Sequence, residues 1–420
     1  MQTRLPETLR CQPQGEEMDR ILRSCVHCGF CNATCPTYQL LGDERDGPRG
    51  RIYLIKQALE TGRTDAGTLQ HLDRCLQCRN CETTCPSGVQ YTRLLELARP
   101  RLLEHAPYRS MPRLHRWLLR KLLPHRVLNR PLFALAAPFR PLLPAFLRRH
   151  LPARVRPARF FARPAPPHVV LFQGCVESTL MGDAHRAAAR LFKAAGFNVL
   201  HLKQEGCCGA IEHHLDAHTA ARRRALANVA QWRHALQAGA DAIVFLSSAC
   251  ELQVRHYPSL LGGQAPDDLD AILKCIQGLD LWLDRHRLPW TTQAGGTVAW
   301  HPPCTLQHGL RRNTHIPALL EQAGYTVLHP DQAHLCCGAA GTYSLLQREI
   351  SQSLGRQRRA ALDACQPQWI TTANIGCLLH LQRDSGPPVL HWATLLARRL
   401  EPEGSPPAQA AMLTSRTAGR

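Results

Sequence analysis

The sequence predicts an α+β, multi-domain protein, in which a small helical module rich in cysteine is followed by a duplicated α/β domain. Two dense cysteine runs lie within residues 1–100. A four-cysteine pattern occurs twice within residues 167–400, where short apolar, β-branched runs alternate with helical patterns. The 420 residues suffice for several cores, and a hydrophobic content of 44% is ordinary for a globular protein.

The first module contains two runs of the form C-x2-C-x2-C-x3-C-P, CVHCGFCNATCP and CLQCRNCETTCP. This spacing is typical of bacterial two-cluster ferredoxins, in which three cysteines of a run bind one [4Fe–4S] cluster and the fourth binds the other. The stretch GRIYLIKQALE between the runs is expected to form a helix. The predicted ligands are Cys25, Cys28, Cys31 and Cys85 for one cluster, and Cys75, Cys78, Cys81 and Cys35 for the other.

The presence of nineteen cysteines indicates metal binding or redox chemistry if the protein is in a reducing compartment. The first residues have neither the apolar core nor the small-residue cleavage site of a secretory signal peptide. We therefore expect the chain to stay in the cytosol, where disulfides are rare. Structural zinc is the alternative, but zinc usually takes two separated C-x2-C pairs. The spacing therefore favours two [4Fe–4S] clusters.

Residues 101–166 form a basic, Pro- and Leu-rich connecting segment. Residues 101–163 carry 15 Lys and Arg against the single acid Glu104, and they supply most of the formal net charge of +19. No run reaches the ~18 apolar residues of a membrane span. Three interpretations stay open: an amphipathic surface for a membrane or a partner subunit, packing on the protein's own domains, and nucleic-acid binding, which the scarcity of aromatic residues disfavours.

The third region is a duplication. Three cysteines recur 129 residues later and a fourth recurs 127 residues later, which predicts a first domain over residues 167–290 and a second over 291–400. The tail, residues 401–420, is expected to be disordered. Strands are expected at 168–172, 198–202 and 241–248 in the first copy and at 297–300, 326–329 and 368–374 in the second, with helices at 179–197 and 217–236.

Every recurring cysteine follows a predicted strand. Because ligands gather at the carboxyl ends of parallel strands, we expect the cysteines of each copy to converge at one edge of a sheet and to form a candidate further metal site. The residues are Cys175, Cys207, Cys208 and Cys250 in the first copy and Cys304, Cys336, Cys337 and Cys377 in the second.

The two copies resemble the cysteine-rich CCG domain, which occurs in heterodisulfide reductases and in iron–sulfur subunits of respiratory dehydrogenases. A ferredoxin module followed by two such domains is similar to the latter group, which includes subunits of glycolate oxidase, anaerobic glycerol-3-phosphate dehydrogenase and lactate-utilisation systems. The stretches HPPCTLQHG, HLCCGAAGTYS and ANIGC most resemble the glycolate oxidase members. The family's fuller motif ends in C-x-x-C, whereas this chain has Ser247 and Asn374 at the first of those positions.

The resemblance implies an oxidoreductase subunit that carries electrons from FAD-containing subunits of its complex toward quinone or another respiratory acceptor. Glycolate, and also D-lactate, would be the substrates, and the location would be the cytoplasmic face of the bacterial inner membrane. The sequence has no G-x-G-x-x-G fingerprint, so we do not expect the chain to oxidise a hydroxy acid alone. A thiol/disulfide reductase, a glycerol-3-phosphate or lactate dehydrogenase subunit, and a zinc-containing nucleic-acid-binding protein are the alternatives.

Several further residues are weaker candidates for metal binding or proton transfer. His301 lies three residues before Cys304, but its counterpart in the first copy is Phe172. His334 corresponds to Glu205. With 22 histidines in the chain, a surface or core role is the simpler expectation for each. The cysteines without a counterpart are expected to be plain thiols: Cys11, Cys275 and Cys365.

Overall fold

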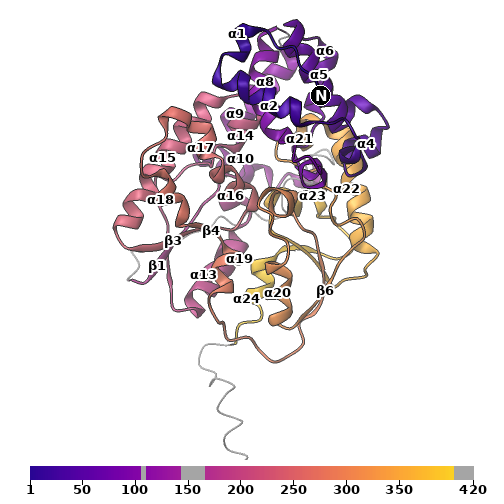
Figure 1. Ribbon diagram of the computed structural model, residues 1–420. Helices are drawn as coiled ribbons and strands as arrows, with labels where there is room; N and C mark the ends of the chain where they lie inside the picture. The colour runs from indigo at the N-terminus through magenta and orange to yellow at the C-terminus, as the bar shows by residue number, and fades with distance from the viewer. Residues whose placement is uncertain (106–109, 143–165, 402–420) are drawn as a thin grey trace, which may run out of the picture.

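The computed structural model describes residues 1–105, 110–142 and 166–401. A helical N-terminal module, indigo in Figure 1, lies against two α/β lobes, of which the first is magenta to pink and the second orange to yellow. Each lobe contains one four-stranded parallel sheet, so the α+β fold class is confirmed. The expected tail beyond Glu401 lies outside the described residues.

The N-terminal module is built from short helices with clear start and stop signals. Proline occupies the first turn of three helices, where its missing N–H costs nothing, and Gly42 and Gly62 end two helices in the left-handed conformation. The last helix continues to His105, past residue 100. The elements are α1 (Glu7–Arg10), α2 (Pro13–Ser24), α3 (Phe30–Ala33), α4 (Pro36–Leu41), η1 (Glu44–Asp46), α5 (Pro48–Thr61), α6 (Ala66–Asp73), α7 (Asn80–Thr84) and α8 (Tyr91–His105).

The described part of the basic segment forms α9 (Ser110–Leu122), α10 (Arg126–Ala136) and η2 (Arg140–Leu142). Arg116 of α9 forms ion pairs with both Asp73 of the N-terminal module and Asp216 of the first lobe. Asn129 of α10 is buried and donates a hydrogen bond to the carbonyl oxygen of Cys175. One side of this segment therefore packs on the protein itself.

The first lobe contains a parallel sheet of strand order β2-β1-β3-β4. The expected strands and the long helix are present, and a kink at Met181 divides the expected helix over 179–197 into two. The elements are β1 (His168–Leu171), α12 (Glu177–Leu180), α13 (Gly182–Ala194), β2 (Asn198–Leu200), α14 (Ala210–His214), α15 (His218–Gln237), β3 (Ala240–Phe245), α16 (Ser248–Arg255), α17 (Tyr257–Leu261), η3 (Gly262–Gln264), α18 (Leu269–Lys274), β4 (Ile276–Gly278) and α19 (Leu279–Asp284).

The second lobe repeats this topology in the order β6-β5-β7-β8. The fourth strand of each lobe was missed by the sequence analysis, because three residues are too few to show a periodic pattern. The elements are β5 (Gly296–Trp300), η4 (Thr305–Gly309, one π-helical turn), α20 (His315–Gln322), β6 (Tyr325–Leu328), α21 (Tyr343–Leu346), α22 (Arg348–Asp363), β7 (Trp369–Thr372), α23 (Ile375–Leu381), β8 (Val389–His391) and α24 (Trp392–Ala397).

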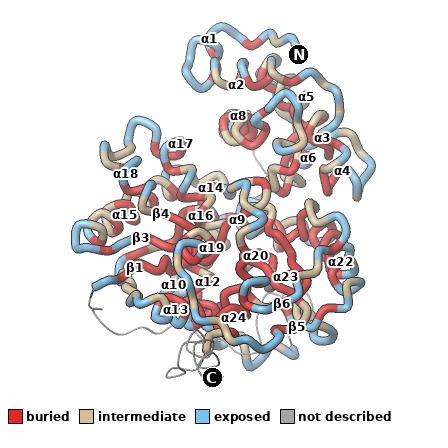
Figure 2. Tube along the Cα trace, turned by 60° about the horizontal axis from the view of Figure 1, so that its bottom comes forward, coloured by how far each residue is buried: buried red, intermediate tan, exposed pale blue. Residues whose placement is uncertain are grey.

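The two lobes share one hydrophobic core. Trp282 of the first lobe and Trp300 and Trp392 of the second belong to a single buried cluster, in which α13 packs on α24. The inner strands β1, β3 and β7 are mostly buried, whereas the edge strands β2 and β6 are partly exposed (Figure 2). Because removing this shared area from water stabilises both lobes together, the two copies hold their cysteine sites in a fixed relation.

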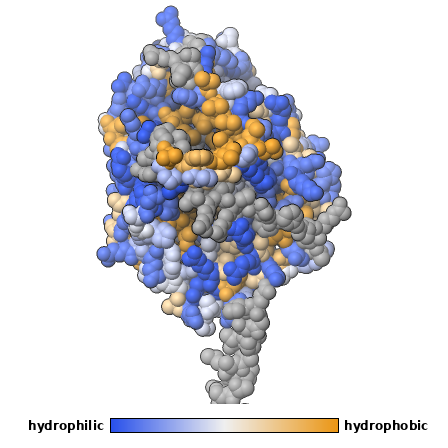
Figure 3. Space-filling model, turned by 180° about the vertical axis from the view of Figure 1, so that it is seen from behind, coloured by the Kyte–Doolittle hydropathy of each residue, from blue (hydrophilic) through white to orange (hydrophobic). Residues whose placement is uncertain are grey.

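The outer side of α9, α10 and η2 is apolar and exposed. Val127 is 85% exposed and Leu142 is 82% exposed. Figure 3, which views the molecule from behind, shows a hydrophobic area on its surface. Among the described residues, no helix is both long and apolar enough to cross a membrane. The other exposed apolar side chains of this face are Leu114, Trp117, Leu118, Leu128, Leu132, Leu135 and Phe139.

Candidate metal centres

The two cysteine loops of the N-terminal module turn at equivalent places. His27 and Gly29 in the first loop have φ values of 58° and 86°, and Gln77 and Arg79 in the second have 52° and 63°. Three of these four residues carry a side chain in a region that only glycine adopts freely. Such strain persists where surrounding structure holds the backbone in place, and it is found at ligand sites.

The cysteines line two cavities with apolar walls. Each cavity contains three cysteines of one run and the last cysteine of the other run, and Cys81 borders both. The first cavity is lined by Cys25, Cys28, Cys31, Cys81 and Cys85. The second is lined by Cys35, Cys75, Cys78 and Cys81. This is the arrangement that an exchange of the fourth ligand requires.

The environment of the thiols in these two cavities favours the binding of a positively charged inorganic group. Burial, together with the like charges of the neighbouring Cys25, Cys85 and Cys28, raises the pKa of Cys31 to about 11. Burial likewise raises the pKa of Cys78 and Cys81. Four crowded thiolates are stable in such a cavity only when positive charge lies between them, and the iron of a [4Fe–4S] cluster supplies it.

A buried cation, Arg51, lies beside the second cavity and was missed by the sequence analysis. Its guanidinium donates to the His71 carbonyl oxygen at 2.8 Å and lies 3.5 Å from the Asp46 carboxylate. Burial lowers the pKa of Arg51, but the Cys75 and Cys35 thiols among its neighbours outweigh burial and raise it. The available signal was an arginine within the apolar face of α5. Its charge favours thiolates at the second cavity.

In the first lobe, the four recurring cysteines lie in a row. The thiols of Cys175 and Cys208 lie next to the sulfur of Cys207, and their interaction with it raises the pKa of Cys175 and Cys208 and lowers that of Cys207. Cys250, at the start of α16, lies next to Cys208. The structure thus brings together the four residues that follow β1, β2 and β3.

The second lobe repeats the row. The sulfurs of Cys304 and Cys336 lie 3.9 Å apart, and Cys337 lies next to both Cys336 and Cys377. The contact with Cys336 and burial raise the pKa of Cys304. Each lobe therefore offers four adjacent sulfur ligands at the carboxyl edge of its sheet, which is chemically suited to iron or zinc.

The glycine of each Cys-Cys-Gly turn has a geometric role. Gly209 and Gly338 have φ values of 86° and 89°, and their N–H groups point at the sulfurs of Cys207 and Cys336 at 3.4 Å. A Cβ at Gly338 would lie 2.7 Å from the Ser351 carbonyl oxygen. Only glycine therefore fits this turn, which places two sulfurs side by side and directs a backbone donor at one of them.

Ser247 and Asn374, which replace a cysteine of the fuller motif, occupy helix N-caps. Asn374 accepts a hydrogen bond from the N–H of Gly376 at 2.8 Å and so caps α23. Ser247 is the N-cap residue of α16 and is buried. The replaced positions thus lie at the amino ends of the helices that carry Cys250 and Cys377.

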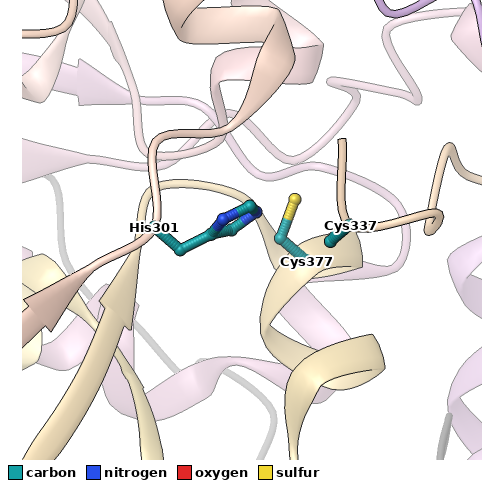
Figure 4. A group of neighbouring side chains, drawn as sticks. All are labelled: His301, Cys337 and Cys377. Atoms are coloured by element: carbon teal, nitrogen blue, oxygen red, sulfur yellow. The ribbon is translucent and has the colours of Figure 1, made fainter. Parts of the chain in front are cut away.

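His301 faces the second row of sulfurs. One of its ring nitrogens and the sulfurs of Cys337 and Cys377 lie within 4.8 Å of one another. Figure 4 shows the ring pointing toward the sulfur of Cys377. His334, by contrast, is partly exposed, and it is its carbonyl oxygen that accepts hydrogen bonds from Asn80 and His308.

The N-terminal module contacts the second lobe at its cysteine row. Cys78 and Cys304 pack against one apolar cluster with Cys336, and their thiols interact electrostatically. Tyr343 of the second lobe donates a hydrogen bond to the carbonyl oxygen of Arg74. The second cavity of the module and the second cysteine row are therefore neighbours.

Comparisons with known families agree with this architecture. Residues 21–89 match the family described as 4Fe-4S dicluster domain, and residues 169–255 and 298–382 each match the Cysteine-rich domain. The two clusters of the N-terminal module and the duplication are thereby confirmed.

The chain is similar along its length to curated proteins. It is 41% identical over 96% of its length to the Glycolate oxidase iron-sulfur subunit of Escherichia coli (strain K12), all of which is covered. It is 28% identical over 88% of its length to the Probable glycolate oxidase iron-sulfur subunit of Bacillus subtilis (strain 168), of which 91% is covered. A hypothetical protein from Helicobacter pylori shares the fold, with a TM-score of 0.53 and 11% identity over 96% of this chain and 75% of that one.

Proposed function

The chain belongs to the family of glycolate oxidase iron–sulfur subunits, and from this premise we propose that it is the electron-transfer subunit of a multi-subunit glycolate dehydrogenase. D-lactate is a second substrate of the same complex. The electrons come from an FAD-containing partner subunit and go to quinone or another respiratory acceptor.

The observation that carries this proposal is the pair of cysteine-lined cavities. A [4Fe–4S] cluster in each supplies one-electron transfer. The proposed ligands remain Cys25, Cys28, Cys31 and Cys85 for the first cavity and Cys35, Cys75, Cys78 and Cys81 for the second. The apolar walls limit the access of water, and Arg51 beside the second cavity offsets the charge of its thiolates.

The first cavity is the proposed entry point for electrons. Val26 and Phe30 line it and are 65% and 63% exposed, and Tyr53 is also exposed nearby. Apolar side chains at the surface around a redox cavity suit a protein partner, because docking removes them from water and brings a flavin close. The partner proposed for this surface is the flavoprotein subunit.

The second cysteine row is the proposed exit. Cys78 lies beside Cys304, so a group bound by Cys304, Cys336, Cys337 and Cys377 is next to the second cavity. The first row, Cys175, Cys207, Cys208 and Cys250, is a further proposed site whose sulfurs contact one another. We propose iron–sulfur groups at these rows in addition to the two ferredoxin clusters.

The apolar face of α9, α10 and η2 is proposed to lie on the cytoplasmic surface of the inner membrane. The exposed Arg113 and Lys121 of α9 would meet anionic lipid head groups, and the exposed Leu, Val and Trp side chains of the face would meet the acyl boundary. This combination favours a peripheral protein that delivers electrons to a lipid-soluble acceptor.

A disulfide reductase is the weaker candidate. Asn374 and Ser247 stand at helix N-cap positions where the fuller motif has a fifth cysteine, so each row offers four sulfurs. The glycerol-3-phosphate and lactate dehydrogenase alternatives differ in the flavoprotein partner, and substrate tests separate them.

The test is anaerobic affinity purification of the tagged full-length chain from membranes and from the soluble fraction. We expect a flavoprotein to co-purify from membranes, and glycolate to reduce the clusters of this complex as followed by EPR. The chain alone should not respond to glycolate. A Phe30→Asp variant should lose the flavoprotein, whereas Leu41→Asp, at an exposed site outside the first cavity, should retain it.

Reduction by glycerol 3-phosphate but not by glycolate would reject the proposed substrate. A colourless chain that contains zinc would reject electron transfer altogether.

A further inference from the structure

His301 is an unexplained polar group at the second cysteine row. It follows β5 and is 1% exposed. Its ring points at the sulfur of Cys377 (Figure 4), and the ligand atoms of His301, Cys337 and Cys377 lie within 4.8 Å of one another. Two roles are chemically open to such a ring, namely a metal ligand and a hydrogen-bond donor.

The hydrogen on the ring is located by Arg358. The Nε atom of Arg358 lies 3.1 Å from Nδ1 of His301, and a guanidinium Nε always carries a hydrogen, so Nδ1 accepts this bond. The Arg358 side chain is held in place because it also donates to the carbonyl oxygens of Asp331 and Gln332. In the neutral ring the single hydrogen is therefore on Nε2.

Nε2 of His301 is buried and has no hydrogen-bond partner among the described residues. Leaving such a donor unsatisfied in the interior is unfavourable. The sulfurs of Cys337 and Cys377 both lie close to the ring, and Figure 4 shows that of Cys377 beside it. A metal-binding histidine instead donates from its other nitrogen to an oxygen acceptor. Since Arg358 makes Nδ1 an acceptor, the structure favours the donor role.

The first lobe lacks this donor. The N–H of Phe172 donates to the Val244 carbonyl oxygen and the N–H of His301 donates to the Thr371 carbonyl oxygen, each at 2.9 Å, so the two residues occupy equivalent places. Phe172 packs against Phe245 and Trp232 in an apolar core. At this position the second row therefore has a hydrogen-bond donor where the first row has an apolar ring.

This inference rests on the iron–sulfur group assigned to the second row under the proposed function. We propose that His301 is a positioning residue that donates from Nε2–H to a sulfur of this group and thereby raises the reduction potential of the group. The group takes up one electron from the second ferredoxin cluster, and no proton moves, because His301 keeps its hydrogen. A hydrogen bond to sulfur stabilises the negative charge that the electron adds.

The test is an EPR-monitored redox titration of the full-length chain with all iron sites filled. His301→Phe reproduces the residue of the first lobe and should make reduction of the second-row group about tenfold less favourable, or about 59 mV for one electron. His301→Gln, which keeps an N–H donor, should stay near the wild-type value. Both ferredoxin clusters should titrate unchanged in the two variants and serve as internal controls.

Electron–nuclear double resonance on wild-type protein with 15N-histidine provides a measurement that needs no variant. We expect an exchangeable proton coupled to the second-row group, without the strong 15N coupling of a direct ligand. Strong 15N coupling, or the loss of about four iron atoms in His301→Phe, would make His301 a ligand and overturn the proposal.

An unchanged potential in His301→Phe, with more than the roughly eight iron atoms of the ferredoxin module present, would overturn the role of His301 alone. A wild-type iron content of only about eight, with both ferredoxin signals intact, would reject the second-row group itself, and this proposal with it.

Discussion

At the scale of single residues, the assignment of ligands to the two clusters depends on which cysteine sulfur lines which cavity. Cys28 lines the first cavity and not the second, although both runs have the same spacing. Spacing predicted the exchanged sets, because a loop of three cysteines cannot also reach around to place the fourth at the same cluster. The burial of Arg51 was not predictable, because a helix pattern does not reveal which polar residue faces a cavity.

We expect Cys28→Ser to remove the cluster of the first cavity and leave that of the second. Iron should fall by about four atoms per chain, and one of two ferredoxin EPR signals should disappear. Cys11→Ser is the matched control, because Cys11 is exposed and lines neither cavity. Two intact signals in Cys28→Ser would show that the ligand assignment is wrong.

At the scale of elements, the fold places each recurring cysteine of the two lobes after a strand, and a tight turn then orients its side chain. The strand–turn pattern was visible in sequence, and so was the duplication. The fourth strands were too short to show, and the caps at Ser247 and Asn374 became evident only when α16 and α23 were in place.

We expect Gly338→Ala to lower the free energy of unfolding by about 1–3 kcal/mol, because alanine is strained at φ 89° and its Cβ meets the Ser351 carbonyl oxygen. Gly341→Ala is the control, since φ is 61° there but the space around a Cβ is open. Chemical denaturation of both variants measures the difference. An equal loss of unfolding free energy in the two variants would mean that the close approach of a Cβ at position 338 to α22 contributes nothing.

At the scale of the whole molecule, ion pairs tie the parts together. Arg312 of the second lobe forms ion pairs with Glu251 and Asp280 of the first lobe, and both carboxylates are buried. Burial raises the pKa of Asp280, although Arg312 opposes this. The Arg99 and Arg116 side chains similarly connect Asp73 with Asp216.

We expect Arg312→Met to cost about 3–5 kcal/mol at neutral pH, because two buried carboxylates lose their partner. Without Arg312 the pKa of Asp280 rises further, so the cost of the substitution relative to wild type is smallest below the ordinary carboxyl range and grows as the pH rises toward the folded-state pKa. Denaturation at several pH values checks this. Arg311→Met, at the exposed neighbouring position, is the control. An equal cost at acidic and neutral pH would contradict the expectation.

The sequence by itself determined the cluster-binding spacing, the duplication and the family, because these depend on residues close together in the chain or on repetition of a pattern. Only the tertiary structure decided that the second ferredoxin cavity adjoins the second cysteine row. It also decided that α9 and α10 pack on the protein with one side and expose apolar residues on the other. Finally, it showed that His301 faces sulfur, whereas Phe172 lies in an apolar core. The physical reason is that these relations join residues distant in sequence, and they are fixed by the burial of shared surface, which leaves no local pattern in the chain.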